Sequence, residues 1–295
     1  MNKGQKMMAK ALLVMLLWGA LFPLVKLGIR TYSAITTGDI LLFAGIRFTI
    51  CGLLISGWTL QQRSFALAQA RQSVTSVLLM GLFAIILHYS FTYLGLSITE
   101  GSKTAILKQL GALFYVCFSA LFVKEDRLTG PKLVGVLLGF AGIVVINADS
   151  SGVHINAGDI LIIAASFCTV FSNVIGKKLF KTVDPIAATG LSQLFGGVIL
   201  LIVGLMLGGS VDMGHSMWIM ICICVASVIS YCLWYSTVKQ GELSKLFIIK
   251  FAEPVFAAVF GAVLLGENIW KWQYLAAFIL IVAGIVVSNR KIKNV

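Results

Sequence analysis

Charged side chains are scarce in this sequence. Only 12% of its 295 residues are Asp, Glu, Lys or Arg, whereas 59% are hydrophobic. An ordinary soluble domain carries about 25% charged residues, because its surface must stay in contact with water. A chain this poor in charge has too little polar surface to cover a water-soluble core. The composition therefore excludes a soluble globular protein and predicts that nearly the whole chain lies in lipid.

Several functional motifs are also missing. The sequence has no phosphate-binding loop of the Walker type and no polar segment long enough for a nucleotide-binding domain, which argues against direct use of ATP. Its six cysteines lie in apolar stretches, and the Cys222-x-Cys224 spacing is not that of a zinc or redox site. We therefore expect no metal and no cofactor.

Groups suited to acid–base chemistry are equally rare. His88 is the one histidine inside a long apolar run, and the Asp residues lie in loops or at helix starts. An intramembrane enzyme, for example one that modifies lipids, would need a clustered acid, base or metal set. We predict no catalytic residue and keep this enzyme class only as the alternative from a different class; a receptor or scaffold is a further alternative.

What the chain does have is a series of apolar runs, each about long enough to cross roughly 30 Å of hydrocarbon. The first run is longer than a signal peptide and lacks an A-x-A cleavage site, so we interpret it as a retained helix. The runs predict an all-α integral membrane protein with ten transmembrane helices. They span residues 9–29, 40–60, 74–93, 102–122, 132–147, 158–178, 186–208, 216–237, 245–265 and 272–289.

The net charge of +12 is spread over the connections between these runs, which argues against a nucleic-acid partner. With a cytoplasmic N-terminus, only Arg30, Lys103 and Lys271 fall on the opposite side. Because cytoplasmic loops of membrane proteins carry an excess of Lys and Arg, this predicts a multi-pass protein of the cell (inner) membrane with both termini cytoplasmic. The cations on the cytoplasmic side are Lys3, Lys6, Lys10, Arg63, Arg71, Lys124, Arg127, Lys132, Lys177, Lys178, Lys181, Lys239, Lys245, Arg290, Lys291 and Lys293.

The second half of the chain repeats the first at a separation of 142 residues. Tyr89 then matches Tyr231, Lys108 matches Lys250, and AGIVV at 141–145 matches AGIVV at 283–287. The same register pairs Tyr93 with Tyr235, Glu100 with Glu242, Ser102 with Ser244, Lys103 with Lys245 and Glu125 with Glu267. We infer an internal duplication, with one five-helix unit in residues 1–147 and the other in residues 158–289.

Because each unit has five spans, an odd number, the two copies must run through the membrane in opposite directions. The loop KEDRL carries Lys124 and Arg127, whereas its counterpart GENIW keeps Glu267 without either cation, as expected on the outer side. Inverted repeats of this kind are typical of secondary transporters that work by alternating access, although a duplicated bundle could also serve as an anchor.

The sequence also resembles a known family. EPVFAAVFGAVLLGE at 253–267, followed by AAFILIVAGIVV, is similar to the hallmark segment of drug/metabolite transporters (DMT superfamily) of the EamA type. WGALF at 18–22, Arg47, and GDILIIAASFCTVFSNVIGKKL at 158–179 match other parts of that pattern. The resemblance implies ten helices in two repeats and export of small metabolites, amino acids or drugs. The chain departs from the family at Gly111-Ala112, where members often have a proline.

The charges inside the spans are the first candidates for substrate binding. Lys250 and Glu253 are three residues apart and could pair on one helix face. Pro254 has no N–H, so we predict a kink and a hinge there. Ionised groups at mid-bilayer cost roughly 2.5–3.5 kcal/mol each unless they find partners or water, which favours a functional role for Arg47, Lys108, Lys250 and Glu253. The alternative for the two lysines is snorkelling toward the interface.

Aromatic residues form a second set of candidates. Tyr89 and Tyr231 occupy equivalent positions, and Trp18 is near them in the pattern, so these rings could stack on a substrate. The alternative is an interfacial aromatic belt. His88 is expected to be a hydrogen-bonded packing residue. Glu125 and Glu267 are expected to cap neighbouring helices or to latch a gate.

Cations outnumber the single Glu253 among the candidates, which favours a carboxylate-bearing small-molecule substrate such as an amino acid or an organic acid. The sequence thus predicts a secondary transporter that exports a small metabolite, with the lipid bilayer as its surroundings and with a monomer or homodimer as its assembly. A multidrug or cation efflux carrier of the same fold is the alternative. Proton coupling through Glu253 and facilitated exchange are both compatible with the residues present.

Overall fold

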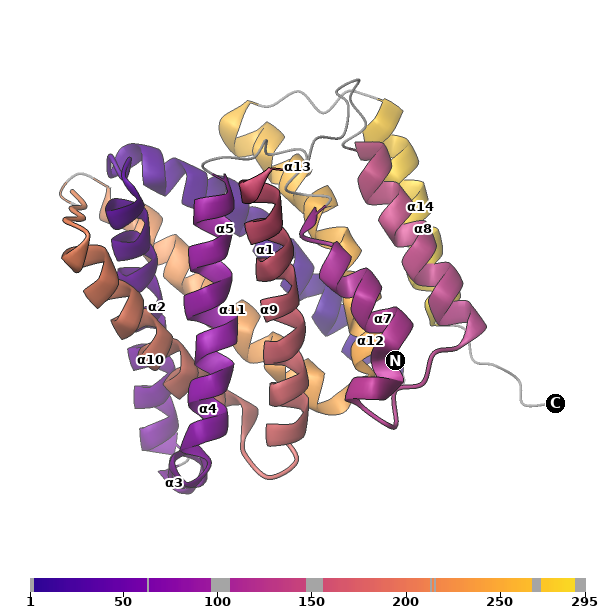
Figure 1. Cartoon of the computed structure of the whole chain (residues 1–295), viewed down its shortest axis with the longest axis horizontal. Coiled ribbons are helices and arrows are strands. Elements are labelled where there is room, and N and C mark those ends of the chain that lie inside the picture. Colours follow the sequence, from indigo (N-terminus) through magenta and orange to yellow (C-terminus); the bar gives the residue numbers. More distant parts are fainter. Residues whose placement is uncertain are drawn as a thin grey trace.

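The computed structural model describes residues 3–62, 64–96, 107–146, 156–212, 214, 216–266 and 272–289. Every regular element within these ranges is helical, and they contain no strand. Figure 1 shows the helices standing roughly side by side as one bundle. This confirms the all-α class that the apolar runs predicted.

Each predicted run coincides largely with helical structure in its described residues, although residues 108–109 form a turn and a few residues at the ends of runs are not helical. Residues 102–106, at the start of the fourth run, lie outside the described ranges. The third and ninth runs are interrupted helices, and a short helix that we did not predict, α3, follows the second run. The first half contains α1 (Lys3–Thr31), α2 (Thr37–Gln62), α3 (Ser64–Gln72), α4 (Val74–Gly81), the π-helical turn η1 (Leu82–Leu87), α5 (His88–Leu96), α7 (Leu110–Phe122) and α8 (Gly130–Ile146).

The second half is likewise helical throughout the described residues. Polar residues begin two of its helices: Asn156 and Asp159 form a reciprocal capping box at α9, and Asp184 accepts hydrogen bonds from the first amides of α10. Its elements are α9 (Ala157–Leu179), α10 (Pro185–Met206), α11 (Met217–Gln240), α12 (Leu243–Ile249), the 3-10 turn η2 (Lys250–Ala252), α13 (Glu253–Leu265) and α14 (Trp272–Ser288).

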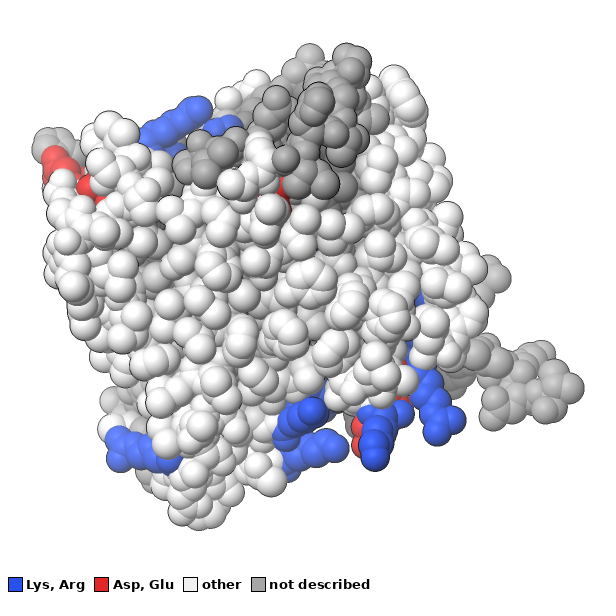
Figure 2. Space-filling model, in the orientation of Figure 1, with Lys and Arg blue, Asp and Glu red and all other residues white. Residues whose placement is uncertain are grey.

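The helices have the length and composition of a multi-pass membrane protein. Within the described ranges, seven helical segments are long and apolar enough to cross a membrane, and α7, α8 and α14 are shorter apolar helices. Large apolar side chains such as Leu121, Met206 and Val263 are at least 75% exposed, which suits contact with lipid and not with water. Figure 2 shows a broad uncharged belt with the charged residues gathered at its two ends.

The closest helix contact joins α2 and α10, at one side of the bundle in Figure 1. Glycines allow it, because a Cβ at Gly45 would overlap the backbone of Leu201 and a Cβ at Gly197 would overlap the backbone of Thr49. Small residues at such contacts let helix backbones approach each other in lipid. On the opposite side of the bundle, α8 packs along α14 in the same manner, with Gly135 against Gly284.

Helix packing follows the same pattern in both halves. α1 packs against α11 and α13 of the second half, and its counterpart α9 packs against α5 and α7 of the first half. Between them lies a core of large buried side chains that includes Phe48, Tyr115 and Trp234, each at most 1% exposed. The two halves therefore share one core.

The connections after α7, α9 and α11 meet at one end of the bundle. Lys177 on α9 donates hydrogen bonds to the carbonyls of Val238 and Gly241 at 2.9 and 2.6 Å, and Lys181 lies 3.7 Å from Glu125. We call this the basic end, because Lys and Arg gather there, along the lower edge of Figure 2. At the other end, the amide of Ser210 donates to Asp39 at 2.7 Å.

Some predicted residues lie outside the described ranges, so the structure says nothing of them. They are Arg63, Glu100, Ser102, Lys103, Glu267, Lys271, Arg290, Lys291 and Lys293.

Candidate functional site

Beside Pro254, where we predicted a kink, the helix tightens into a 3-10 turn. α12 ends at Ile249, a single 3-10 turn follows from Lys250, and α13 begins at Glu253. Pro254 thus occupies the first turn of a new helix, where its missing N–H costs least. The break places Lys250 at the point where one helix stops and Glu253 at the point where the next one starts.

The first half has an equivalent break without any proline. Lys108 and Gln109 form a turn immediately before α7, which begins at Leu110. Lys108 therefore occupies the same place in its half as Lys250 does in the other, although Gly111-Ala112 stands where the second half has Glu253-Pro254. The departure from the family pattern does not restore a continuous helix.

Both lysines point to rings on α1. The Nζ atom of Lys250 lies 5.4 Å from the ring centre of Trp18, and that of Lys108 lies 4.8 Å from the ring centre of Phe22. These distances are typical of cation–π contacts. Because Trp18 and Phe22 are four residues apart on one helix, they share a face of α1 and bring the two ammonium groups to the same side of it.

Glu253 completes this group, but it does not form the expected ion pair with Lys250. No nitrogen–oxygen contact within 4.0 Å joins the two described side chains. Glu253 is 8% exposed, and its Oε2 atom has no hydrogen-bond partner among the described residues. It nevertheless lies within electrostatic range of both lysines. We call Trp18, Phe22, Lys108, Lys250 and Glu253 the charged cluster.

Equivalent tyrosines from the two halves meet beside the charged cluster. The hydroxyls of Tyr89 and Tyr231 are 2.9 Å apart, the Trp18 ring lies 5.6 Å from Tyr231, and the Phe48 ring lies 4.6 Å from Tyr89. Their separation of 142 residues is the repeat distance itself. The rings are therefore part of the interior between the two halves. We call Trp18, Phe48, Tyr89, Tyr231 and Trp234 the ring cluster.

Arg47 packs against the ring cluster. Its guanidinium lies 4.7 Å from the Phe48 ring centre and 5.9 Å from that of Tyr89, and its Nε donates to Ser227 at 3.0 Å. The side chain is 3% exposed. The contacts of the Arg47 side chain among the described residues are with these rings and with the Ser227 hydroxyl.

Of two polar residues in the interior, one was predicted from the sequence and the other was not. His88 has its Nδ1 atom 3.0 Å from the Ala165 carbonyl oxygen and 3.1 Å from the Thr169 hydroxyl, in keeping with the packing role that we predicted. Asn173 was not singled out from the sequence, yet its Oδ1 accepts a hydrogen bond from Trp234 at 2.7 Å. The available signal was an amide side chain in an otherwise apolar span.

The tyrosine pair gives a prediction about stability. Either Tyr89→Phe or Tyr231→Phe leaves the partner hydroxyl without its bond, which should lower the free energy of unfolding by about 1 kcal/mol. The double variant removes both polar groups and should cost less than the sum of the two single changes. Denaturant unfolding in detergent measures this, and additive losses would contradict a direct bond.

Comparisons with known proteins agree with this architecture. The EamA-like transporter family matches residues 5–148 and 156–290. A "probable amino-acid metabolite efflux pump" of Escherichia coli (strain K12) is 25% identical over 94% of this chain and 93% of its own length. A protein with the same description from Salmonella typhimurium (strain LT2) is 27% identical over 94% and 93%.

A protein of known crystal structure shares the fold. It is 21% identical, with a TM-score of 0.80 over 97% of this chain and 96% of that one. The names of the family and of these relatives are those of transporters and not of enzymes. With two matches that together span nearly the whole sequence, the chain belongs to the EamA-like transporter family.

Proposed function

We propose that this protein is a secondary transporter that exports a small carboxylate-bearing metabolite, such as an amino acid or an organic acid, by alternating access. In this proposal ten transmembrane helices form two inverted five-helix repeats, 1–147 and 158–289. Both termini are cytoplasmic in the cell (inner) membrane. The charged and ring clusters bind the substrate, and Pro254 marks a hinge.

The observation that carries the proposal is the equivalence of Lys108 and Lys250. Each lies in a turn that precedes a helix, and each places its ammonium over a ring of α1. A change of backbone hydrogen-bonding pattern within a membrane helix is tolerated where the segment is buried in protein or lines an aqueous path. Paired broken helices at the interface of two repeats are the usual substrate-binding arrangement in secondary transporters.

The contact between Tyr89 and Tyr231 supports the repeat geometry. A residue that touches its own counterpart must lie near the axis that relates the two copies. The mirrored packing of α1 and α9 supports the same axis. The concentration of Lys and Arg at the basic end supports a cytoplasmic position for that end.

The substrate class follows from charge. Two ammonium groups face one carboxylate in the charged cluster, so a ligand that brings a carboxylate would balance the charge in a region of low dielectric constant. An amino acid would in addition offer its ammonium to the unpartnered Oε2 of Glu253. The names of the Escherichia coli and Salmonella relatives are consistent with this class.

A second candidate, efflux of organic cations, is favoured by one observation. Glu253 is buried with an oxygen that has no hydrogen-bond partner among the described residues, and a desolvated carboxylate attracts a cation. In that case neutralising Glu253 should remove transport, whereas neutralising the lysines should not. The two candidates are therefore separable by the same pair of variants.

Counterflow in proteoliposomes tests the proposal. Vesicles are loaded with one unlabelled amino acid or dicarboxylic acid, and uptake of its radiolabelled form is measured without ATP. We expect transient accumulation of at least one carboxylate-bearing solute, with the solute recovered chemically unchanged.

Empty vesicles and vesicles with the exposed Lys178→Met variant are the controls. Accumulation of organic cations alone would favour the second candidate. Chemical conversion of the solute, or no movement of any solute, would contradict a transporter.

A further inference from the structure

A buried carboxylate at the basic end joins the two halves of the chain. Asp126, in the connection between α7 and α8, is 3% exposed. It accepts hydrogen bonds from the amide of Ser244 at 2.8 Å, from the hydroxyl of Ser244, and from the hydroxyl of Tyr115 at 3.1 Å. Ser244 belongs to α12 of the second half, so this single side chain spans the two units.

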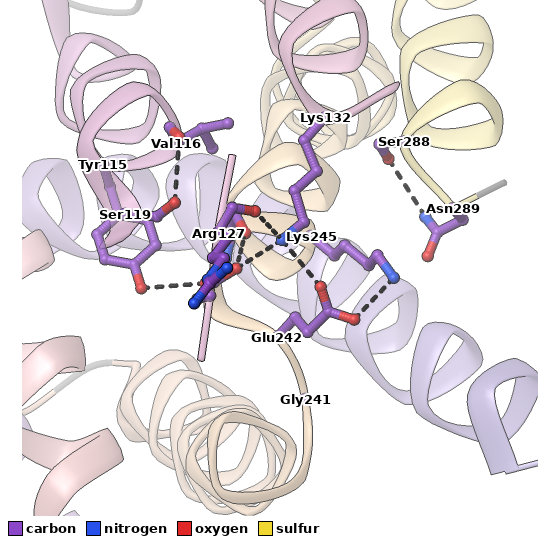
Figure 3. A network of polar contacts seen from close by, with 12 residues as sticks. Tyr115, Val116, Ser119, Arg127, Lys132, Gly241, Glu242, Lys245, Ser288 and Asn289 are labelled. Carbon is purple, nitrogen blue, oxygen red and sulfur yellow. Dashed lines mark hydrogen bonds and ion pairs between the residues drawn. The ribbon is translucent and has the colours of Figure 1, made fainter. Parts of the chain in front are cut away.

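Lys132 extends the network. Its Nζ atom, on a side chain only 5% exposed, lies 2.7 Å from Asp126 and 2.9 Å from Glu242, and it also donates to the Arg127 carbonyl at 2.8 Å. Glu242 in turn pairs with Lys245 at 2.8 Å. Figure 3 shows Lys132 reaching across from α8 to Glu242, with Lys245 on its far side. We call Asp126, Lys132, Glu242 and Ser244 the latch.

Glu125, which we expected to cap a neighbouring helix or to latch a gate, is not part of this network. The Glu125 side chain is 74% exposed, and it pairs with the exposed Lys181 at 3.7 Å. The adjacent residue, Asp126, turns inward instead. Its counterpart in the other half and Glu267 lie outside the described residues.

The latch is ionised in the conformation described. Burial opposes the charged form of Asp126, but hydrogen bonds from Lys132 and Ser244 outweigh it and hold the pKa of this carboxyl below its ordinary value. Two of these contacts cross between the halves: Ser244 donates to Asp126, and Lys132 pairs with Glu242. Asp126 keeps Lys132 and Tyr115 within the first half, so opening of this end must break the Ser244 and Glu242 contacts and expose their polar groups to water.

Two helices, α12 and α7, connect the latch to the charged cluster. Ser244 lies in the first turn of α12, and Lys250 directly follows the last residue of that helix. A single helix of roughly 10 Å therefore connects the two residues. On the other side, Tyr115 lies on α7, which begins two residues after Lys108. The Tyr115 ring also packs 5.0 Å from that of Phe247 on α12.

We propose that the latch is a gate lock: it holds the basic end closed in this conformation, and displacement of Lys108 and Lys250 by substrate releases it through α7 and α12. The lock itself stands on the contacts above, whereas its release by substrate rests on the proposed transport function. The chemistry is a shared set of hydrogen bonds and ion pairs, so no covalent step is involved.

Thiol accessibility tests the lock without any transport assay. Ser119, fully buried on α7 four residues beyond Tyr115, is replaced by cysteine in a variant whose six native cysteines are serine. A membrane-impermeant maleimide is applied from the basic end. We expect slow labelling with the latch intact and labelling at least about fivefold faster with Lys132→Met, a factor at the lower end of typical coupling energies.

Lys178→Met, at the same end but outside the latch, is the matched control and should not change the rate. Equal labelling rates in all three backgrounds would overturn the lock.

Cross-linking provides the second measurement, in case Lys132→Met fails to fold. Asp126→Cys and Ser244→Cys are combined and oxidised with copper phenanthroline, which converts the two thiols into a disulfide. We expect the double variant to lose counterflow on oxidation and to recover it with dithiothreitol, while each single variant is unaffected by oxidant.

Undiminished transport in the cross-linked protein would overturn the proposal. Failure of the transport function itself would show differently: the unmodified protein would move no solute, whereas the maleimide result would still report on the lock.

Discussion

Replacement of Lys250 by methionine is expected to remove most transport of carboxylate-bearing solutes and to leave the protein folded. Methionine is close to lysine in length and is apolar, but it removes the ammonium group that lies over the Trp18 ring. Loss of one member of a buried set of charges costs about 2–5 kcal/mol of binding. Because about 1.4 kcal/mol is tenfold in affinity, the half-saturating concentration should rise by about 30-fold or more.

Initial rates of counterflow over a range of solute concentrations measure this effect. Lys108→Met should act in the same direction, because Lys108 has the equivalent position and a matching ring contact with Phe22. Lys178→Met removes a cation from an exposed position and is the matched control. Wild-type kinetics of Lys250→Met with every carboxylate, together with loss of transport in Glu253→Gln, would instead assign the protein to organic cations.

Replacement of Gly197 by leucine is expected to prevent correct folding. A Cβ at this position already overlaps the backbone of Thr49 on α2, so a leucine would force α2 and α10 apart. Overpacking of a core typically costs about 1–3 kcal/mol. The cost here should be higher, because the clash is with backbone along the most extensive helix contact and not with a flexible side chain.

Gly57→Leu is a matched control on the partner helix α2, because nothing lies within 4 Å of a Cβ at Gly57. Size-exclusion chromatography and thermal unfolding in detergent distinguish the two variants. We expect Gly57→Leu to resemble the wild type and Gly197→Leu to be lost or aggregated. A monodisperse Gly197→Leu protein with an unchanged Tm would show that the two helices can separate at little cost.

The positions of the helices were predictable because length and apolarity in lipid leave little choice. The run predicted at 158–178 is the helix Ala157–Leu179, and the run at 245–265 ends at Leu265 as expected. The break before Glu253 was predictable for a separate reason, since proline removes a backbone donor at a known position. These features depend on local sequence alone.

Contacts between distant segments were harder to predict. Position along a helix gives the depth of Arg47 but not its neighbours, so it was grouped with lysines although its contacts are with Phe48, Tyr89 and Ser227. Asp126 stands in the polar stretch KEDRL, where any acid would be taken for a surface residue. Its partner Ser244 is 118 residues away, and nothing local indicates that one acid of the stretch turns inward.

The break at Lys108 has a consequence for the reading of related sequences. The helix is interrupted at Lys108 and at Lys250, positions 142 residues apart. No proline lies close to Lys108 or within α7. A search that locates helix interruptions by their prolines alone would find the one beside Glu253 and miss the one at Lys108. If the two halves are copies, as the sequence predicts, aligning them against each other locates the interruption that has no proline from the one that has it.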